Sequence, residues 1–336
     1  MDSLTHVVIG ACIGEAFFKE GFGKKAMLWG ALAQSIPDID FVASFWLNTS
    51  DNLLAHRGFT HSFFFALLII PIFALLANKI HQPHSIIFKT WLLFFGTEVF
   101  SHLFLDTFNN YGVGWFEPFN PARFSFNSIY VADPFFSIWA VIAFVFLVFL
   151  NPFSTKRNFW WKFGIFIPLI YLSYCTYNKF KIDSDVKQIL SKQNISYKRY
   201  FTTPAPLQNW LWYVVVEQEK GYYVGYRSLF DNKRQIDFSY FPKNDFLLKP
   251  VNDSKEVQKL IQFSKGFYTI EKYNDTLVFN DLRFGQIIGW QNPKEKFVFH
   301  YYLQHPNDNK LVVQRGRFEK WNWLVAQNFW IRIKGN

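Results

Sequence analysis

FTHSFFFALLIIPIFALLAN, which spans Phe59–Asn78, is the stretch that decides the expected fold. It contains no Asp, Glu, Lys or Arg, and an apolar helix of about this length crosses the hydrocarbon core of a bilayer. Three further apolar runs have a similar length: Thr90–Thr107, Tyr130–Leu150 and Phe159–Tyr177. Two shorter segments precede them and cross only part of the core: Leu4–Phe18 and Ala26–Ile36. We therefore predict a membrane α-helical bundle with four long spans and a short N-terminal helical hairpin.

Charge is distributed unevenly along the chain. The 336 residues have a formal net charge of +10, and only 18% of them are charged, whereas soluble domains have about 25%. Residues 1–178 have equal numbers of basic and acidic side chains, so the basic excess lies entirely in residues 179–336. The apolar content excludes a disordered chain, and two cysteines exclude a disulfide scaffold. We expect a transmembrane helical domain at 1–178 and a separate domain at 179–336.

The C-terminal half has the short alternating runs that are typical of β-strands. The predicted strands are Leu211–Glu217, Tyr222–Phe230, Gln235–Phe241, Phe267–Lys272, Phe297–Leu303 and Leu311–Arg317. Amphipathic helices are expected at Asp183–Lys192 and Lys255–Lys265. The expectation is a β-rich α+β soluble domain. Trp210 and Trp212 are expected to be exposed aromatic residues. Together with the basic charge they indicate either contact with anionic headgroups or polymers, or simply a solvated basic face.

Basic residues mark one set of the loops between the predicted spans. Eight of the ten basic residues in 1–178 lie in that set: Lys19, Lys24, Lys25, Lys79, Lys89, Lys156, Arg157 and Lys162. The opposite loops contain only Arg57 and Arg123. Because short cytoplasmic loops carry the excess of Lys and Arg, we predict a multi-pass protein whose C-terminal domain lies outside the cytoplasm. Nucleic acid is therefore disfavoured as a partner.

The few ionisable residues of the predicted spans gather in short motifs. They are His6, Asp38, Asp40, His56, His61, His102 and Asp106. Alternating helix directions bring all of them to the outer end of the bundle. Charged residues within apolar helices are costly, and they indicate a functional site by default.

The residue types in these motifs suit a metal site. His102 and Asp106 are four residues apart, so they share one face of a helix and can reach one ion. Imidazole and carboxylate ligands together favour zinc, with manganese or iron as alternatives. One carboxylate can also bridge two ions about 3.5–4 Å apart, the arrangement that serves phosphoester hydrolysis. Asp40 or His56 is a candidate general base if it is not a ligand.

Arg57 and Arg123 are the candidate substrate-binding residues. A guanidinium group can hold a phosphate or another anion through paired hydrogen bonds. Pairing with Asp51 or Glu117 within the protein is an equally open interpretation.

The motif series as a whole resembles a known family. The motifs are Asp2-Ser3-Leu4-Thr5-His6, Pro37-Asp38-Ile39-Asp40, His56-Arg57-Gly58-Phe59-Thr60-His61-Ser62, His102-x-x-x-Asp106, Tyr111-Gly112 and Asp133-Pro134. The series resembles the LexA-regulated, membrane-bound, predicted metal-dependent hydrolases (YdjM-like), over roughly residues 1–150. The resemblance implies a bacterial inner-membrane protein and a metal-dependent hydrolase.

A more distant resemblance is to zinc-dependent phospholipases C and the related single-strand nucleases. The matching residues are Thr5-His6, Asp38, Thr60-His61, Gly96, His102 and Asp106. By this resemblance, one zinc ion would be held by His61, His102 and Asp106, and a second by His6, Asp38 and a bridging Asp106. The chain departs from those enzymes in the longer Gly-to-His spacing. It also lacks their third cluster of His and Glu and their processed N-terminal amine.

Three functions compete on these grounds. The first is a membrane-embedded hydrolase that uses metal-activated water on a phosphoester or other ester, with membrane lipid or another anionic compound as substrate. The second is a structural or stress-response membrane protein whose metal only stabilises the bundle; such a site is closed, with four protein ligands. The third, a di-iron lipid desaturase, is disfavoured because the sequence lacks paired HxxHH boxes.

Overall fold

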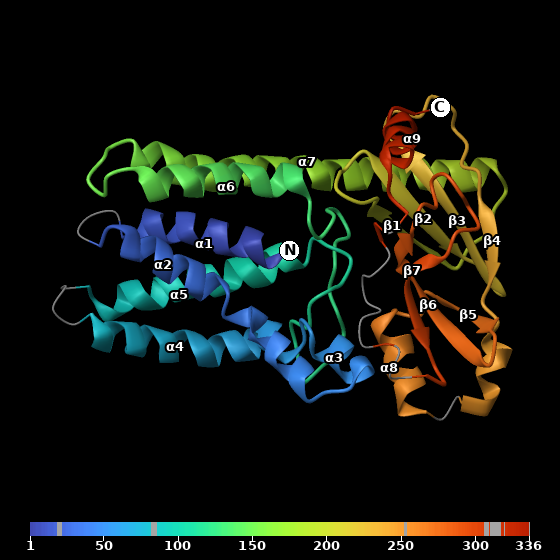
Figure 1. The fold of residues 1–336 in the computed structure, drawn as a ribbon, viewed down its shortest axis with the longest axis horizontal. Coiled ribbons are helices and arrows are strands. Elements are labelled where there is room, and N and C mark those ends of the chain that lie inside the picture. The colour runs from blue at the N-terminus through green and yellow to red at the C-terminus, as the bar shows by residue number, and fades with distance from the viewer. Residues whose placement is uncertain are drawn as a thin grey trace. The chain divides into compact units, whose positions relative to one another are not determined.

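The computed structural model describes residues 1–18, 22–81, 86–251, 254–305, 309, 317–318 and 320–335. The chain divides into two compact units (Figure 1): Met1–Phe45 with Ala55–Cys175, and Trp46–Leu54 with Thr176–Asn336. The division after Cys175 falls inside the long helix α7 (Arg157–Lys192), close to the predicted boundary after residue 178.

The first unit is helical. Its helices are α1 (Ser3–Phe17), α2 (Lys24–Gln34), α4 (Phe63–Ile80), α5 (Phe88–Asp106), α6 (Pro134–Phe149) and the first part of α7. Two 3₁₀ segments join them, η1 (Pro37–Phe45) after α2 and η2 (Phe59–His61) before α4. Side-chain caps set the helix starts: Asp2 accepts from the backbone N–H of Thr5, and Ser62 from that of Phe65.

Small residues let α1 and α2 pack closely. A Cβ atom added to Gly30 would overlap the carbonyl oxygen of Gly10, and one added to Gly14 would overlap that of Ala26. Small residues at such spacing allow helix backbones to approach each other. The close α1–α2 pair positions the start of α1 beside η1, which follows α2.

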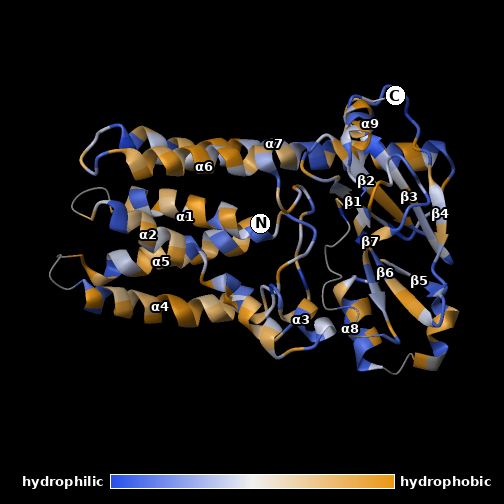
Figure 2. Cartoon of the chain, in the orientation of Figure 1, coloured by the Kyte–Doolittle hydropathy of each residue, from blue (hydrophilic) through white to orange (hydrophobic). Residues whose placement is uncertain are grey.

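The predicted bundle of four long spans is wrong. Among the residues that the structure describes, α4 alone is long and apolar enough to cross a membrane. α6 has only 16 residues, and α5 contains Lys89, Glu98, His102 and Asp106. α7 has charged side chains in its first turns and again from Lys179 onward, with three tyrosines between them. The chain instead combines helices with β-sheets (Figure 2). The predictions of a multi-pass topology and of a C-terminal half outside the cytoplasm depended on the four spans. The structure therefore does not support them.

The second unit contains two antiparallel sheets. One has the order β1 (Arg199–Pro204), β2 (Leu211–Glu217), β3 (Gly221–Ser228) and β4 (Ser239–Pro242). The other has the order β5 (Tyr268–Tyr273), β6 (Thr276–Gln286) and β7 (Phe297–Tyr302). The remaining elements are α3 (Thr49–Ala55), η4 (Asp245–Val251), α8 (Lys255–Phe263), α9 (Trp323–Ile333) and the end of α7.

The two faces of the four-stranded sheet are both buried. On one face, side chains from the end of α7, among them Ile182, Val186 and Ile189, pack against Trp212 and Val214 of β2. On the other face, a cluster joins β2 and β3 to the second sheet: Phe201, Tyr213, Val215, Tyr222, Val224, Phe267, Leu282 and Phe297. Trp212 is fully buried, so its predicted role as an exposed aromatic residue is wrong.

The predicted strands of this half overlap observed ones where the apolar pattern was regular. Leu211–Glu217 is β2, and the segments beginning at Tyr222, Gln235, Phe267 and Phe297 overlap β3, β4, β5 and β7. The segment Leu311–Arg317 lies outside the described residues except for Arg317. β6 was not predicted because Asp281 and Arg283 interrupt its apolar pattern. The two side chains form a buried ion pair at 2.6 Å.

Candidate metal centre

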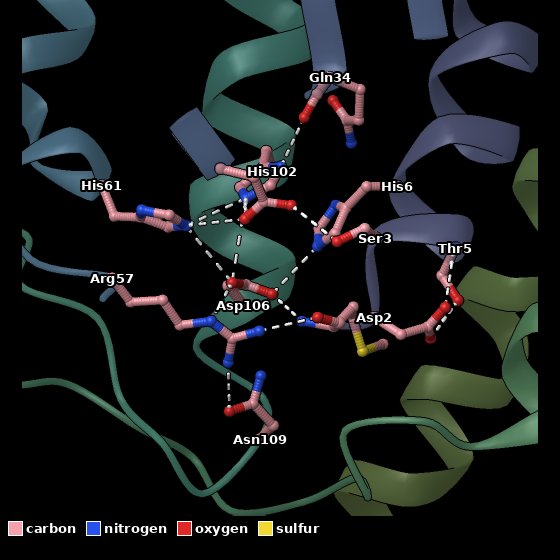
Figure 3. A network of polar contacts seen from close by, with 12 residues as sticks. Asp2, Ser3, Thr5, His6, Gln34, Arg57, His61, His102, Asp106 and Asn109 are labelled. Carbon is pink, nitrogen blue, oxygen red and sulfur yellow. Dashed lines mark hydrogen bonds and ion pairs between the residues drawn. The ribbon is translucent and has the colours of Figure 1, made fainter. Parts of the chain in front are cut away.

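The predicted ligands come from four separate elements. His6 lies in the first turns of α1, Asp38 in η1, His61 at the end of η2, and His102 and Asp106 in the last turns of α5. Figure 3 shows His6, His61, His102 and Asp106 pointing toward one another. Within the described residues, Asp38, His61, His102 and Asp106 form a group that could hold a metal ion, with one ligand atom of each within 4.8 Å of the others.

The donor atoms of this group have the spacing of a coordination sphere. The Nε2 atoms of His61 and His102 lie 3.2 Å apart. Asp38 Oδ1 lies 3.6 Å from the first and 3.5 Å from the second, and Asp106 Oδ2 lies 3.6 Å and 3.9 Å from them. Zinc bonds of about 2.0–2.1 Å at tetrahedral angles place ligand atoms about 3.3 Å apart. The four atoms therefore fit one small divalent ion with a modest contraction.

Hydrogen bonds orient both imidazoles toward the centre of the group. His102 Nδ1 lies 2.6 Å from the carbonyl oxygen of Gln34, which can only accept, so Nδ1 carries the proton and the Nε2 lone pair faces the other ligands. His61 Nδ1 lies 3.1 Å from Thr60 Oγ1 and 3.6 Å from Asp40 Oδ2. Burial lowers the pKa of His61 to about 3, which favours the neutral imidazole that a metal ion binds.

Both oxygens of the Asp106 carboxylate have further contacts inside the protein. Arg57 Nε lies 2.7 Å from Asp106 Oδ2, and the amino group of Met1 donates to Oδ1. His6 Nε2 lies 3.1 Å from the same Oδ1, and its ring stacks on that of His102 with centroids 3.8 Å apart. His6 is thus next to the four-residue group and contacts the carboxylate oxygen that faces away from it.

The centre retains excess negative charge. The side chains of Asp38, Asp40 and Asp106 lie near the guanidinium group of Arg57. Burial raises the pKa of Asp38, but hydrogen bonds with His102 and His61 outweigh burial and leave its pKa well below the usual value. Burial lowers the pKa of the Met1 amino group and so weakens its positive charge. A divalent cation would balance the carboxylates.

Asp40 and His56 form a pair beside the ligands. Asp40 Oδ2 accepts from the backbone N–H of Arg57 at 2.7 Å, and it lies 3.3 Å from His56 Nδ1 and 3.6 Å from His61 Nδ1. Burial raises the pKa of Asp40, but the hydrogen bond with His56 and the nearby imidazoles outweigh it, so the pKa is lowered overall. The His56 side chain is 42% exposed. A single carboxylate therefore connects the ligand His61 to a solvent-accessible imidazole.

The two arginines predicted to bind substrate are engaged with the protein. Arg57 is buried with a left-handed φ of 57°. Besides its ion pair with Asp106, it donates to Asn109 Oδ1 at 2.9 Å and to the Met1 carbonyl at 2.7 Å. Arg123 donates to the His56 carbonyl at 2.8 Å. Its guanidinium also lies 3.8 Å from Glu117, the pairing that the sequence left open.

Sequence reasoning did not identify the groups that orient the ligands. The Gln34 carbonyl, the Asn109 amide and the Met1 amino group all contact site residues. Backbone groups leave no residue-type signal, so Gln34 could not be found from a motif. Asn109 follows Asp106 by three residues and lies just beyond the His102-x-x-x-Asp106 motif.

Comparison with known proteins places the chain in a family. The model of the YdjM inner membrane protein family matches residues 1–182, which is more than half of the chain. The inner membrane protein YbcI of Escherichia coli is 29% identical over 156 residues, covering 46% of this chain and 79% of YbcI. The uncharacterized protein YfhP of Bacillus subtilis is 34% identical over 148 residues, covering 41% of this chain and 43% of YfhP. No solved structure matches the chain. The chain belongs to the YdjM inner membrane protein family, and this membership supports a location in the inner membrane.

Proposed function

We propose that this chain is a metal-dependent hydrolase of the inner membrane that acts on a phosphoester or another ester of a lipid-like substrate. The observation that supports the proposal best is the convergence of Asp38, His61, His102 and Asp106 on one point. The names of the family and of its relatives state no activity, so the proposal depends on the chemistry of these side chains.

The donor set favours zinc, with manganese or iron as alternatives, because it combines two imidazole nitrogens with carboxylate oxygens. Asp38, His61, His102 and Asp106 would hold one ion. His6 and the second oxygen of Asp106 are the donors available to a second ion. When bound, such an ion lowers the pKa of a water ligand and polarises an ester or phosphoryl oxygen.

His56 is the proposed general base. Its Nδ1 faces Asp40, which can hold that nitrogen protonated and leave Nε2 able to accept a proton from the attacking water. Asp40 is itself fixed by the backbone N–H of Arg57. The carboxylate would also stabilise the imidazolium that forms when the proton is transferred.

The surface beside the site supports an amphiphilic substrate. η1 carries Asp38 and Asp40 toward the ligands, and Ile39, Phe41 and Phe45 of the same segment are exposed. The Asp38 side chain is itself 21% exposed, whereas His61, His102 and Asp106 are fully buried. The site therefore opens at Asp38, next to an apolar surface that can contact an acyl chain.

Purified full-length protein in detergent tests the proposal. Metal content measured by mass spectrometry should be lost in His102→Ala and retained in His305→Ala, which changes an exposed histidine of the second unit. Hydrolysis should be measured on phospholipids and on bis-p-nitrophenyl phosphate. His56→Gln should keep the metal and lose activity. Full activity in His56→Gln, or unchanged metal content in His102→Ala, would contradict the proposal.

A second candidate is a structural metal site, which one specific observation favours. Four protein atoms already surround the proposed position of the ion, as in closed sites. In that case metal removal would lower the melting temperature, and no ester would be hydrolysed with or without the ion. Spectroscopy of the cobalt-substituted protein distinguishes the two, because an exchangeable water ligand changes the spectrum when an anion such as azide is added.

A further inference from the structure

Helix α9 has two apolar faces, and only one of them is used inside the second unit. Val325, Phe329 and Ile333 are buried. Phe329 and Ile333 pack with Ala205 and Leu211. The opposite side presents large apolar side chains to solvent: Trp323, Leu324, Trp330 and Ile331. Trp330 is 53% exposed and Ile331 62% exposed, values that are far from those of core residues.

This exposed face continues onto a neighbouring loop. Phe230 is exposed, and with Trp210, Trp330, Ile333 and Lys334 it lines an apolar groove of about 490 Å³. The loop is fixed to the end of α9 because Arg332 pairs with Asp231 at 2.7 Å. Ser228 Oγ also donates to the carbonyl oxygen of Ile333. The apolar surface is thus built by two rigidly joined segments.

Cations border this surface. Lys233 and Arg234 follow Phe230 in the loop and are exposed, and Lys334 follows the last turn of α9 with its ammonium 5.5 Å from the Trp330 ring. α9 contains no acidic residue. Tryptophan and aliphatic side chains bordered by Lys and Arg are the signature of a segment that lies at a membrane–water interface.

We propose that α9 and the Phe230 loop form an interfacial anchor that inserts its aromatic side chains at the headgroup boundary of a bilayer containing anionic lipids. The charge of the surface argues for this occupant, since the +10 excess of the chain lies in this half. The family model ends at residue 182, so the anchor belongs to the part of the chain outside the family match. The proposal does not depend on the metal centre.

The test uses full-length protein reconstituted in nanodiscs, with a nitrobenzoxadiazole label on a single introduced cysteine. The native Cys12 and Cys175 are buried. Label positions are Ile331→Cys and Leu324→Cys on the exposed face, with Asp275→Cys in the exposed β5–β6 turn as the control. In phosphatidylcholine–phosphatidylglycerol discs, labels at 331 and 324 should emit at shorter wavelength and be quenched by doxyl-labelled lipid. The label at 275 should do neither.

Charge substitutions test the role of the cations. Lys233→Ser and Arg234→Ser should each reduce the ratio of docked to undocked helix about fivefold in anionic discs. The matched pair Lys255→Ser and Lys272→Ser, which lies on α8 and β5, should leave it unchanged. The proposal is overturned if labels at both 331 and 324 stay solvent-like. It is also overturned if their blue shift disappears when discs hold one copy, because a second copy would then cover the face.

Discussion

Replacing Arg57 by Met distinguishes a buried counter-ion from a substrate-binding residue. Arg57 and Asp106 are both buried and lie 2.7 Å apart. Removing one partner of a buried pair costs about 3–5 kcal/mol, because the remaining charge is left uncompensated. A zinc ion on Asp106 supplies a replacement charge. Zinc should therefore stabilise Arg57→Met more than it stabilises the wild type, and the stability gap between them should narrow.

The assay is thermal or denaturant unfolding of purified protein, with EDTA and with zinc at about one hundred times its Kd, a concentration that stabilises the native state by about 2.7 kcal/mol. Arg157→Met is the matched control. Arg157 pairs with Glu15 at 2.6 Å, and both side chains are buried like those of the first pair. Its loss of stability should be the same with and without zinc. An Arg57→Met protein of wild-type stability, or one whose deficit zinc does not reduce, would refute the reasoning.

Three other substitutions give independent tests. Gly30→Ala should lower stability by about 1–3 kcal/mol, because the added methyl overlaps the Gly10 carbonyl; an unchanged melting temperature would contradict the close packing of α1 and α2. Burial raises the pKa of Asp133 to about 6, so the folded state favours the protonated carboxyl group. The stability that this protonation contributes is fully present below the unfolded pKa and is lost as the pH rises through about 6. The free energy of unfolding of Asp133→Asn relative to the wild type should therefore rise by up to about 3 kcal/mol between about pH 4 and pH 7. A difference that does not change with pH would argue against the raised pKa of Asp133. Asp40→Asn should lower zinc affinity or activity about 10–100-fold through its contact with His61, as measured by metal titration and turnover; equal values to wild type would exclude that role.

The sequence was most informative where the spacing between two residues is enough to fix their relative position. His102 and Asp106 share a helix face at any depth in a membrane or a soluble core, so their placement did not depend on the wrong span count. The positions of Asp38 and His61 could also be predicted, because each residue lies at the end or the start of a segment that packs beside α5. The four-residue group could therefore be predicted although the bundle around it could not.

Hydropathy over long runs was less informative because it ignores where helices end and what they contain. The predicted span Tyr130–Leu150 includes Asp133, which caps α6 and leaves a 16-residue helix. The contact between Arg57 and Asp106 was also beyond prediction. Its left-handed backbone turns the side chain inward to Asp106, and residue type alone indicates an outward-facing anion binder equally well.

The origin of the ligands in η1, η2 and α5 has a consequence for how the chain is held together. Residues 38, 61, 102 and 106 are far apart in the chain, so an ion bound to all four would act as a cross-link that closes two long loops. Closing such loops restricts the unfolded chain more than the folded one. Loss of the ion would release η1 and η2 first, because short 3₁₀ segments have few hydrogen bonds of their own. Limited proteolysis within residues 37–61 would then report metal occupancy directly.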